Sequence, residues 1–161
     1  MILYHGSNIE IDQIDLGKSR PNKDFGQGFY LSADRNQALE MAKNRVRLMH
    51  TGIPVINAFE FDESALNNPS LNVKIWDDYC AEWAQFVVDN RNPSTPNFAH
   101  DYDIVYGPIA DDGVTFQLRR YEAKIITIEQ LVTELRYSKG ITFQYFFATP
   151  LSLSYLTKII P

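Results

Sequence analysis

The chain has 161 residues, of which 45% are hydrophobic and 13% aromatic, so we expect one folded domain over residues 1–161. A formal net charge of −5 argues against a protein that captures nucleic acid through a dense lysine and arginine surface. With Cys80 as its single cysteine, the chain can form neither an internal disulfide nor a cysteine-based zinc site, which is typical of a reducing cytoplasm.

The remaining composition predicts no metal and no membrane contact. The three histidines, His5, His50 and His100, lack metal-ligand spacing. No signal peptide and no apolar run of about 18 residues occurs. We therefore expect a cytoplasmic protein.

Hydrophobic periodicity and turn residues predict mixed strands and helices in the first half of the chain. The predicted elements are a strand at 2–4 ending at His5-Gly6-Ser7, a polar loop at 18–22, a glycine-flanked aromatic strand at 25–32, a helix capped by Ser32 or Asp34 and running to 49, and a strand at 55–61.

The second half continues without a regular alternation of strand and helix. The predicted elements are a helix at 77–88, a surface turn at 93–96, a bent strand or strand pair at 103–110, a helix capped by Asp111 or Asp112, a helix capped by Thr127, an aromatic strand at 141–147 and a closing helix at 150–158. This order favours the α+β fold class over a doubly wound sheet.

The first motif with chemical potential is His5-Gly6-Ser7. A histidine at a strand end presents an imidazole at the sheet edge, and the following glycine lets a ligand approach the backbone closely. Read alone, these three residues are more often a turn with a hydrogen-bonded histidine, by roughly two to one.

The second motif is Gly26-Gln27-Gly28-Phe29-Tyr30. Two glycines before an aromatic pair allow a strand to pass beneath a flat ligand and expose a ring for stacking. The glycine spacing differs from that of a dinucleotide-fold fingerprint. Read alone, Phe29 and Tyr30 are typical of a core.

Taken together and in this order, the two motifs resemble those of the ADP-ribosyltransferase superfamily, in its diphtheria-toxin and poly(ADP-ribose)-polymerase-like branch. The chain is also similar to an uncharacterised bacterial family of that superfamily, through Tyr4-His5-Gly6-Ser7, the segment 24–31 and the segment 101–112. The resemblance covers nearly the whole chain. It implies a split β-sheet core with flanking helices, and NAD as co-substrate without a metal.

The resemblance also implies roles for single residues. His5 would hydrogen-bond a ribose hydroxyl of NAD, the Gly6 backbone would hold the nicotinamide carboxamide, and Tyr30 would stack on the nicotinamide ring. A cationic ring over an aromatic face gains about 0.5–2 kcal/mol. Ser7, Gly28 and Phe29, which belong to the same two motifs, complete the expected NAD-binding set.

The third catalytic position departs from the branch, which carries a glutamate on a late strand. The late strand here, 141–147, holds no carboxylate, and Gln144 is its only polar side chain of suitable length. An amide can hydrogen-bond ribose hydroxyls, but charge assistance roughly doubles the strength of such a bond. We therefore expect slow or single transfer of ADP-ribose, and expect Gln144→Glu to preserve or raise NAD hydrolysis. Strand alternation places Gln144 and Phe146 on one face.

Other charged residues have two interpretations each. Among Lys18, Arg20 and Lys23, Arg20 is the candidate to bind the NAD pyrophosphate, and the alternative is a solvated loop. The cluster of Asp101, Asp103, Asp111 and Asp112 could be an acid–base site, but helix caps and strand ends explain these residues as well.

The leading hypothesis is an NAD-dependent mono-ADP-ribosyltransferase acting as the toxin of a bacterial toxin–antitoxin pair, with the antitoxin as a partner protein. Its acceptor would be a protein or, alternatively, a nucleic acid. The second hypothesis is a non-catalytic module that binds NAD or ADP-ribose. An RNA 2′-phosphotransferase is less favoured because it needs several arginines around the histidine. A purely structural domain leaves the two ordered motifs unexplained.

Overall fold

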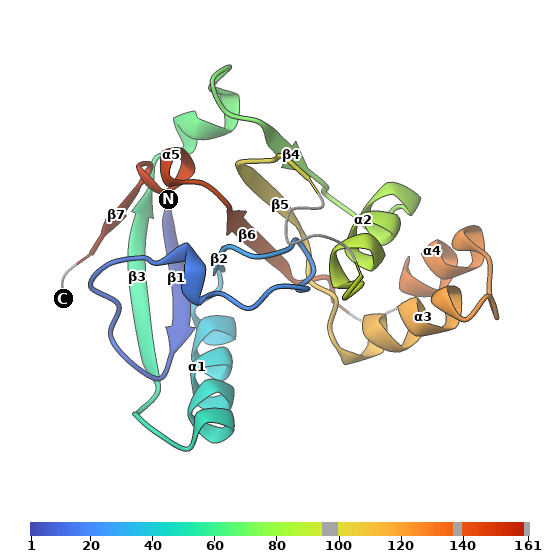
Figure 1. Cartoon of the computed structure of the whole chain (residues 1–161), viewed down its shortest axis with the longest axis horizontal. Coiled ribbons are helices and arrows are strands. Elements are labelled where there is room, and N and C mark those ends of the chain that lie inside the picture. Colours follow the sequence, from blue (N-terminus) through green and yellow to red (C-terminus); the bar gives the residue numbers. More distant parts are fainter. Residues whose placement is uncertain (95–99, 137–139, 160–161) are drawn as a thin grey trace.

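The computed structural model describes residues 1–94, 100–136 and 140–159. In these residues the fold is mixed α+β, with two sheets and five α-helices (Figure 1), which confirms the predicted fold class. The elements are β1 Ile2–Ser7, the 3-10 turn η1 Leu16–Lys18, β2 Phe29–Leu31, α1 Arg35–Met49, β3 Val55–Phe61, the 3-10 turn η2 Glu63–Asn67, β4 Val73–Ile75, α2 Ala81–Arg91, β5 Ile104–Pro108, α3 Asp112–Glu122, α4 Ile128–Arg136, β6 Phe143–Phe147, α5 Pro150–Leu153 and β7 Leu156–Lys158.

The strands form two sheets that pack on each other through a shared hydrophobic cluster. The first sheet has the order β1-β3-β7 and the second the order β2-β6-β5-β4, and every pair except β4–β5 is antiparallel. An isolated bridge joins β1 to the end of β2, because Tyr4 and Ser32 exchange backbone hydrogen bonds of 2.8 and 2.9 Å. The two motifs therefore lie on neighbouring strands at the junction of the sheets.

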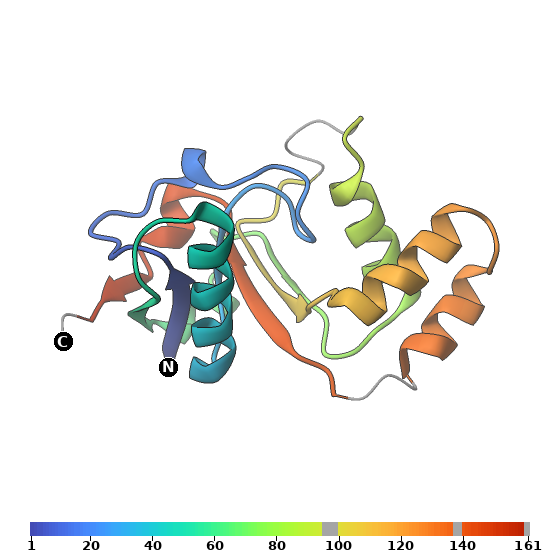
Figure 2. The ribbon, with the colours of Figure 1, turned by 90° about the horizontal axis from the view of Figure 1, so that it is seen from below.

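Helix α1 packs closely on β1, beside which it lies in Figure 2. Its buried Ala38 and Ala42 lie directly over Gly6. A Cβ atom at Gly6 would lie 1.9 Å from the carbonyl oxygen of Ala38, so only glycine permits this approach. Asp34 caps the helix by accepting from the amide of Asn36.

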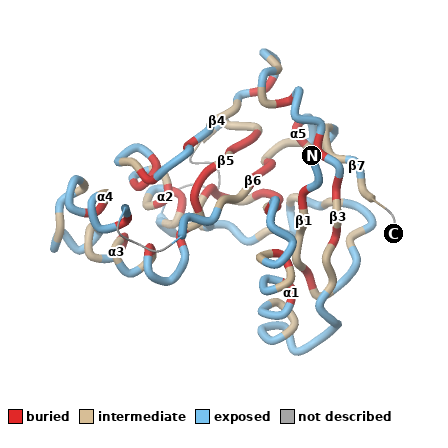
Figure 3. The backbone as a smooth tube through the Cα atoms, turned by 180° about the vertical axis from the view of Figure 1, so that it is seen from behind, coloured by how far each residue is buried: buried red, intermediate tan, exposed pale blue. Residues whose placement is uncertain are grey.

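Strand β6 separates two hydrophobic clusters. Phe146 packs with the residues of α2, α3 and α4, whereas Tyr145 and Phe147 pack with β1, β2 and β3. The predicted alternation along this strand is therefore confirmed for these three aromatic residues. Figure 3 shows the buried segments concentrated on the central strands and on the inner faces of the helices.

Several predicted elements differ from the observed ones. The closing helix at 150–158 is wrong: Thr149 and Ser152 form a capping box that starts the short helix α5, and the chain then pairs with β3 as strand β7. The aromatic strand at 25–32 is limited to Phe29–Leu31, because Gly26 turns the chain at φ 93°. The β7 pairing is a tertiary contact, whereas this turn is closed locally by the amide of Gly26, which donates to the carbonyl oxygen of Lys23 at 3.0 Å.

The other boundaries differ by less. The predicted helix at 77–88 begins at Ala81 and extends to Arg91, and β4 was not predicted. The segment 103–110 contains one strand, β5. Asp111 caps α3 and Thr127 accepts from the amide of Gln130 at the start of α4, as expected. Part of the predicted turn at 93–96 lies outside the described residues.

Candidate functional site

The candidate site lies where β1 and β2 part beyond the Tyr4–Ser32 bridge. In a strand, residues two positions apart direct their backbone N–H and C=O to the same side. Since Tyr4 bonds to Ser32, the N–H and C=O of Gly6 also face β2. Among the described residues none bonds to these two groups from that side. This edge therefore has one donor and one acceptor that lack a partner from the side of β2 among the described residues.

The imidazole of His5 reaches across this gap. Its Nδ1 lies 2.8 Å from the carbonyl oxygen of Tyr30, and its ring stacks on Phe29 at 4.6 Å between centroids. A carbonyl oxygen only accepts, so Nδ1 carries a hydrogen. Burial lowers the pKa of His5, the bond to Tyr30 partly opposes this effect, and the charges of Lys23 and Arg45 lower it further. His5 is therefore neutral, with Nε2 as an acceptor.

The Nε2 atom of His5 is also accessible. It has no hydrogen-bond partner among the described residues. Because no buried side-chain nitrogen or oxygen in this part of the chain lacks a partner, an unpartnered Nε2 must be reachable by solvent. A ligand hydroxyl can therefore donate to it.

Tyr30 has a buried hydroxyl and a partly covered ring. The hydroxyl donates to the carbonyl oxygen of Gly26 at 2.6 Å and accepts from the amide of Phe25 at 3.1 Å. Burial and then the charge of Asp24 raise its pKa well above the usual value. The Lys23 ammonium lies 4.7 Å from the ring centroid. The Tyr30 hydroxyl thus fixes the loop of residues 24–28, which we name the glycine loop, through two hydrogen bonds. The Lys23 ammonium lies over the Tyr30 ring.

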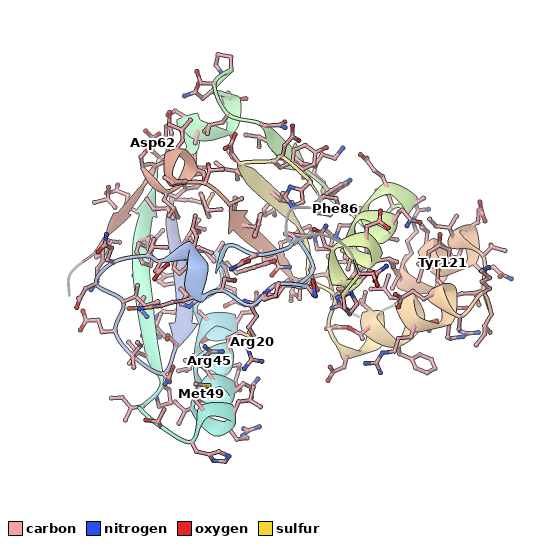
Figure 4. All side chains as sticks on the ribbon, viewed as in Figure 1. Arg20, Arg45, Met49, Asp62, Phe86 and Tyr121 are labelled. Carbon is pink, nitrogen blue, oxygen red and sulfur yellow. The ribbon has the colours of Figure 1, made fainter. Side chains whose placement is uncertain are left out.

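Three cations act on one another's charge in this part of the chain. The pKa of Lys23 is lowered by burial, then by the charges of Arg45 and Arg20, and the charge of Asp24 partly opposes this effect. Figure 4 shows the side chains of Arg20 and Arg45 extending beside α1. None of the three forms a salt bridge within the described residues. We name Arg20, Lys23 and Arg45 the cation cluster. Sequence reasoning missed Arg45, although its position three residues after Ala42 places it on the helix face toward β1.

The other expected NAD-binding residues have local structural roles. Ser7 is buried, and its Oγ accepts from the amide of Ile9 at 3.4 Å. A Cβ atom at Gly28 would lie 2.3 Å from the ring of Phe146 and 2.7 Å from the carbonyl oxygen of Phe147. Gly28 therefore permits the glycine loop to cross β6.

The side chain of Gln144 bonds to Asp24. Its Nε2 donates to Asp24 Oδ2 at 3.3 Å. Asp24 Oδ1 also pairs with Arg91 at 2.7 Å. No bond joins Gln144 to His5 or Tyr30 among the described residues. Sequence reasoning assigned no role to Asp24. Its carboxylate contacts Gln144, the late-strand position at which the resemblance leads one to expect a glutamate.

The aspartate cluster suggested by the sequence does not form one site. Asp103 accepts from the amide of Asn72 at 2.7 Å and from Thr149 Oγ1 at 2.6 Å, and Asp101 accepts from the Asn72 side chain at 2.9 Å. Asp111 caps α3. In the described part of the chain no group of three or more His, Cys, Asp or Glu side chains could hold a metal ion.

A pocket of about 330 Å³ lies next to this region but is not lined by His5 or Tyr30. Phe25 and Phe146 form a wall of the pocket and also pack against Tyr30, with ring centroids at 6.3 and 5.0 Å from it. His100 lines the pocket, with Nε2 2.8 Å from the carbonyl oxygen of Phe25 and Nδ1 accepting from the amide of Tyr102 at 3.1 Å.

No helix in the described ranges has both the length and the apolar character to cross a bilayer. No curated protein and no solved structure matches this chain. The model of a family described as a protein of unknown function (DUF3990) matches residues 1–157, so the chain belongs to that family.

Proposed function

We propose that the protein is an NAD-dependent mono-ADP-ribosyltransferase, with the split sheet of the ADP-ribosyltransferase superfamily. The observation that carries the proposal is the open edge between β1 and β2. There the N–H and C=O of Gly6 and the Nε2 of the preceding residue, His5, have no hydrogen-bond partner among the described residues. This arrangement supports a ligand that offers a carboxamide and a hydroxyl.

The nicotinamide riboside part of NAD offers both groups. Its carboxamide can donate to the carbonyl of Gly6 and accept from the N–H of Gly6. A ribose hydroxyl can donate to His5 Nε2. The nicotinamide ring carries a positive charge, as the Lys23 ammonium does, so it would replace one cation over Tyr30 by another.

The cation cluster supports the phosphate end of the same ligand. Arg20, Lys23 and Arg45 carry three positive charges, and none of them forms a salt bridge within the described residues. A pyrophosphate carries about two negative charges, and charged hydrogen bonds to phosphate are roughly twice as strong as neutral ones. Arg20, the candidate from the sequence, thus belongs to a larger group.

In the proposed reaction the bond between the nicotinamide nitrogen and the ribose C1′ breaks, and nicotinamide leaves with the electron pair. A nucleophile of the acceptor then bonds to the cationic C1′ and loses its proton to water. Gly6 and Tyr30 would orient the leaving group, which is the part of catalysis that positioning supplies. Gln144 has no full charge to oppose the sugar cation, so transfer is slow and limited to one ADP-ribose.

The acceptor in this proposal is a protein, since the net charge of −5 disfavours a polyanionic one. The small size of the chain and its resemblance to a bacterial family support, by analogy, a role as the toxin of a toxin–antitoxin pair in the cytoplasm, which a second protein neutralises.

A second candidate function is a module that binds NAD or ADP-ribose without turnover. The absence of a carboxylate on β6 favours this alternative. It retains the roles of Gly6, His5 and the cation cluster, and differs only in the chemical step.

Labelled NAD and a bacterial lysate separated into protein and nucleic acid test both candidates. We expect the wild type, but not His5→Ala, to transfer label to protein. Label on nucleic acid would show that the acceptor is a nucleic acid and not a protein. Absence of transfer, with NAD binding measurable by calorimetry, would support the binding module, and absence of binding would overturn both candidates.

A further inference from the structure

Asp24 is a mostly buried carboxylate that receives hydrogen bonds from three distant elements. Its Oδ1 accepts from Arg91 Nε at 2.8 Å, and its Oδ2 accepts from the amide of Ala110 at 3.0 Å. Gln144 Nε2 adds the bond of 3.3 Å to Oδ2. The side chain is 13% exposed. The bonds from Arg91 and Ala110 therefore fix the position of the Asp24 carboxylate without any contribution from Gln144.

A fixed carboxylate determines the orientation of the Gln144 amide. An ionised carboxylate only accepts hydrogen bonds, so the NH₂ of the amide must face Asp24 and the carbonyl oxygen Oε1 must face away. Oε1 accepts no hydrogen bond from the described residues, and Gln144 is half-buried. Since no buried polar side-chain atom among these residues lacks a partner, Oε1 is exposed to solvent.

The exposed oxygen lies on the same face of the sheet as Tyr30. Tyr30 pairs directly with Phe146 across β2 and β6, and Gln144 is two residues before Phe146 on the same strand face. The charge of Asp24 also reaches the hydroxyl of Tyr30, whose pKa it raises. Asp24, Gln144 and Tyr30 are thus parts of one region.

We propose that Asp24 is a positioning residue that holds the Gln144 amide with its carbonyl oxygen toward the bound sugar. Oε1 then accepts from a ribose hydroxyl and directs the negative end of the amide dipole at the developing cation. Asp24 does not touch the sugar. The inference rests on the proposed function, and it explains how a glutamine can serve where the superfamily uses glutamate.

The orientation itself can be measured without NAD. In ¹H–¹⁵N spectra the side-chain amide signals of Gln144 are assigned by their loss in Gln144→Met. We expect Asp24→Asn to shift these signals. The matched control is Asp89→Asn, since Asp89 accepts from the Gln85 amide at 2.8 Å on the surface of α2. This control should shift the signals of Gln85 and leave those of Gln144 unchanged.

The catalytic consequence is tested by NAD-consumption kinetics in a double-mutant cycle. We expect Asp24→Asn to lower kcat about tenfold with KM within about twofold, since one oriented hydrogen bond is lost. In the Gln144→Met background the same change should have no further effect on kcat. A merely structural role of Asp24 would instead lower kcat equally in both backgrounds.

The outcomes separate the two proposals. If the wild type is active, the role of Asp24 would be overturned by an Asp24→Asn variant with unchanged Gln144 amide signals or an unchanged kcat. An equal loss of kcat in the wild-type and Gln144→Met backgrounds would overturn it as well. A wild type that neither binds nor consumes NAD, while its Gln144 signals still depend on Asp24, would overturn the proposed function. If the wild type binds NAD without turnover, Asp24→Asn must weaken NAD affinity only when Gln144 is present.

Discussion

The regions around His5 and His100 use the same residue type in two different ways. Both imidazoles bond to a backbone carbonyl at 2.8 Å, of Tyr30 and of Phe25 respectively, and burial is the largest cause of the lowered pKa of each. The second nitrogen of His100 accepts from the amide of Tyr102. The second nitrogen of His5 has no partner among the described residues and is accessible.

Burial and a lowered pKa therefore do not by themselves distinguish the histidine that we propose to bind a ligand from one whose two nitrogens are both bonded within the chain. His100 has both ring nitrogens occupied by the chain, so it connects the glycine loop to the segment before β5. His5 has one nitrogen occupied, and the other has no partner in the part of the chain that the structure describes. The unused acceptor is therefore the feature that distinguishes the two.

The largest expected effect is on the stability of the His100 region. His100→Ala would leave the Phe25 carbonyl and the Tyr102 amide without their partner, which costs about 2–4 kcal/mol in the free energy of unfolding. For a chain of this size the melting temperature would fall by roughly 5–15 °C. NAD affinity, measured by calorimetry below the transition, should stay within about twofold. A His100→Ala variant that keeps its melting temperature but loses NAD affinity would show that His100, and not only His5, binds the ligand.

His5→Ala should produce the opposite result. We expect NAD affinity to fall about tenfold, because one hydrogen bond to a ribose hydroxyl is removed. The melting temperature should change less than in His100→Ala, because a single bond to Tyr30 is lost. Calorimetry and thermal melts on the same two variants measure both quantities. An unchanged dissociation constant would contradict the site.

The pH dependence of stability tests the feature that the two histidines share. Both folded pKa values lie below the usual 6.5, so near this pH the unfolded chain binds more protons than the folded one. The stabilisation is complete above pH 6.5 and decreases as the pH falls through 6.5 toward the lowered values. Each unit of lowering corresponds to about 1.4 kcal/mol.

Thermal melts between pH 7.5 and 5.5 measure this effect. We expect His5→Asn and His100→Asn each to reduce the slope of melting temperature against pH. His50→Asn is the control, since His50 is exposed and its left-handed conformation (φ 52°) suits asparagine. A flat wild-type profile would show that neither histidine titrates as described.

The smallest expected effect concerns the cation over Tyr30. Lys23→Met removes an ammonium that nicotinamide must otherwise displace, so free nicotinamide should bind about two- to fivefold tighter, equivalent to about 0.5–1 kcal/mol. NAD should gain less, because one positive charge near its phosphates is lost. Lys43→Met, which alters an exposed lysine paired with Glu40, is the control. Weaker binding of nicotinamide to Lys23→Met would show that nicotinamide does not stack on Tyr30.

The structure also changes an expectation for Gln144→Glu. From the sequence this variant was expected to preserve or raise NAD hydrolysis. Asp24 Oδ2 lies 3.3 Å from the side chain of Gln144, so a glutamate would put two carboxylates in contact and lose the bond that orients the amide. We now expect Gln144→Glu to lower hydrolysis, and the kinetics described above measure it.

The sequence predicted the elements whose causes are local. Asp34, Asp111 and Thr127 cap helices as expected, because an N-cap side chain bonds within three residues. Period-two alternation predicted the faces of Tyr145, Phe146 and Phe147. By contrast, β7 depends on pairing with β3, far along the chain, and local propensity predicted a helix there.

The sequence alone determined the α+β class, the order of the two motifs and the placing of His5 and Tyr30 on strands. Only the tertiary structure decided that His5 keeps an unused acceptor while His100 does not, and that Arg45 joins Arg20 and Lys23. It also decided that Asp24 orients Gln144, a bond between residues 120 positions apart. Hydrogen-bond partners at such separations depend on how the sheets and helices pack, which periodicity and motif spacing do not specify.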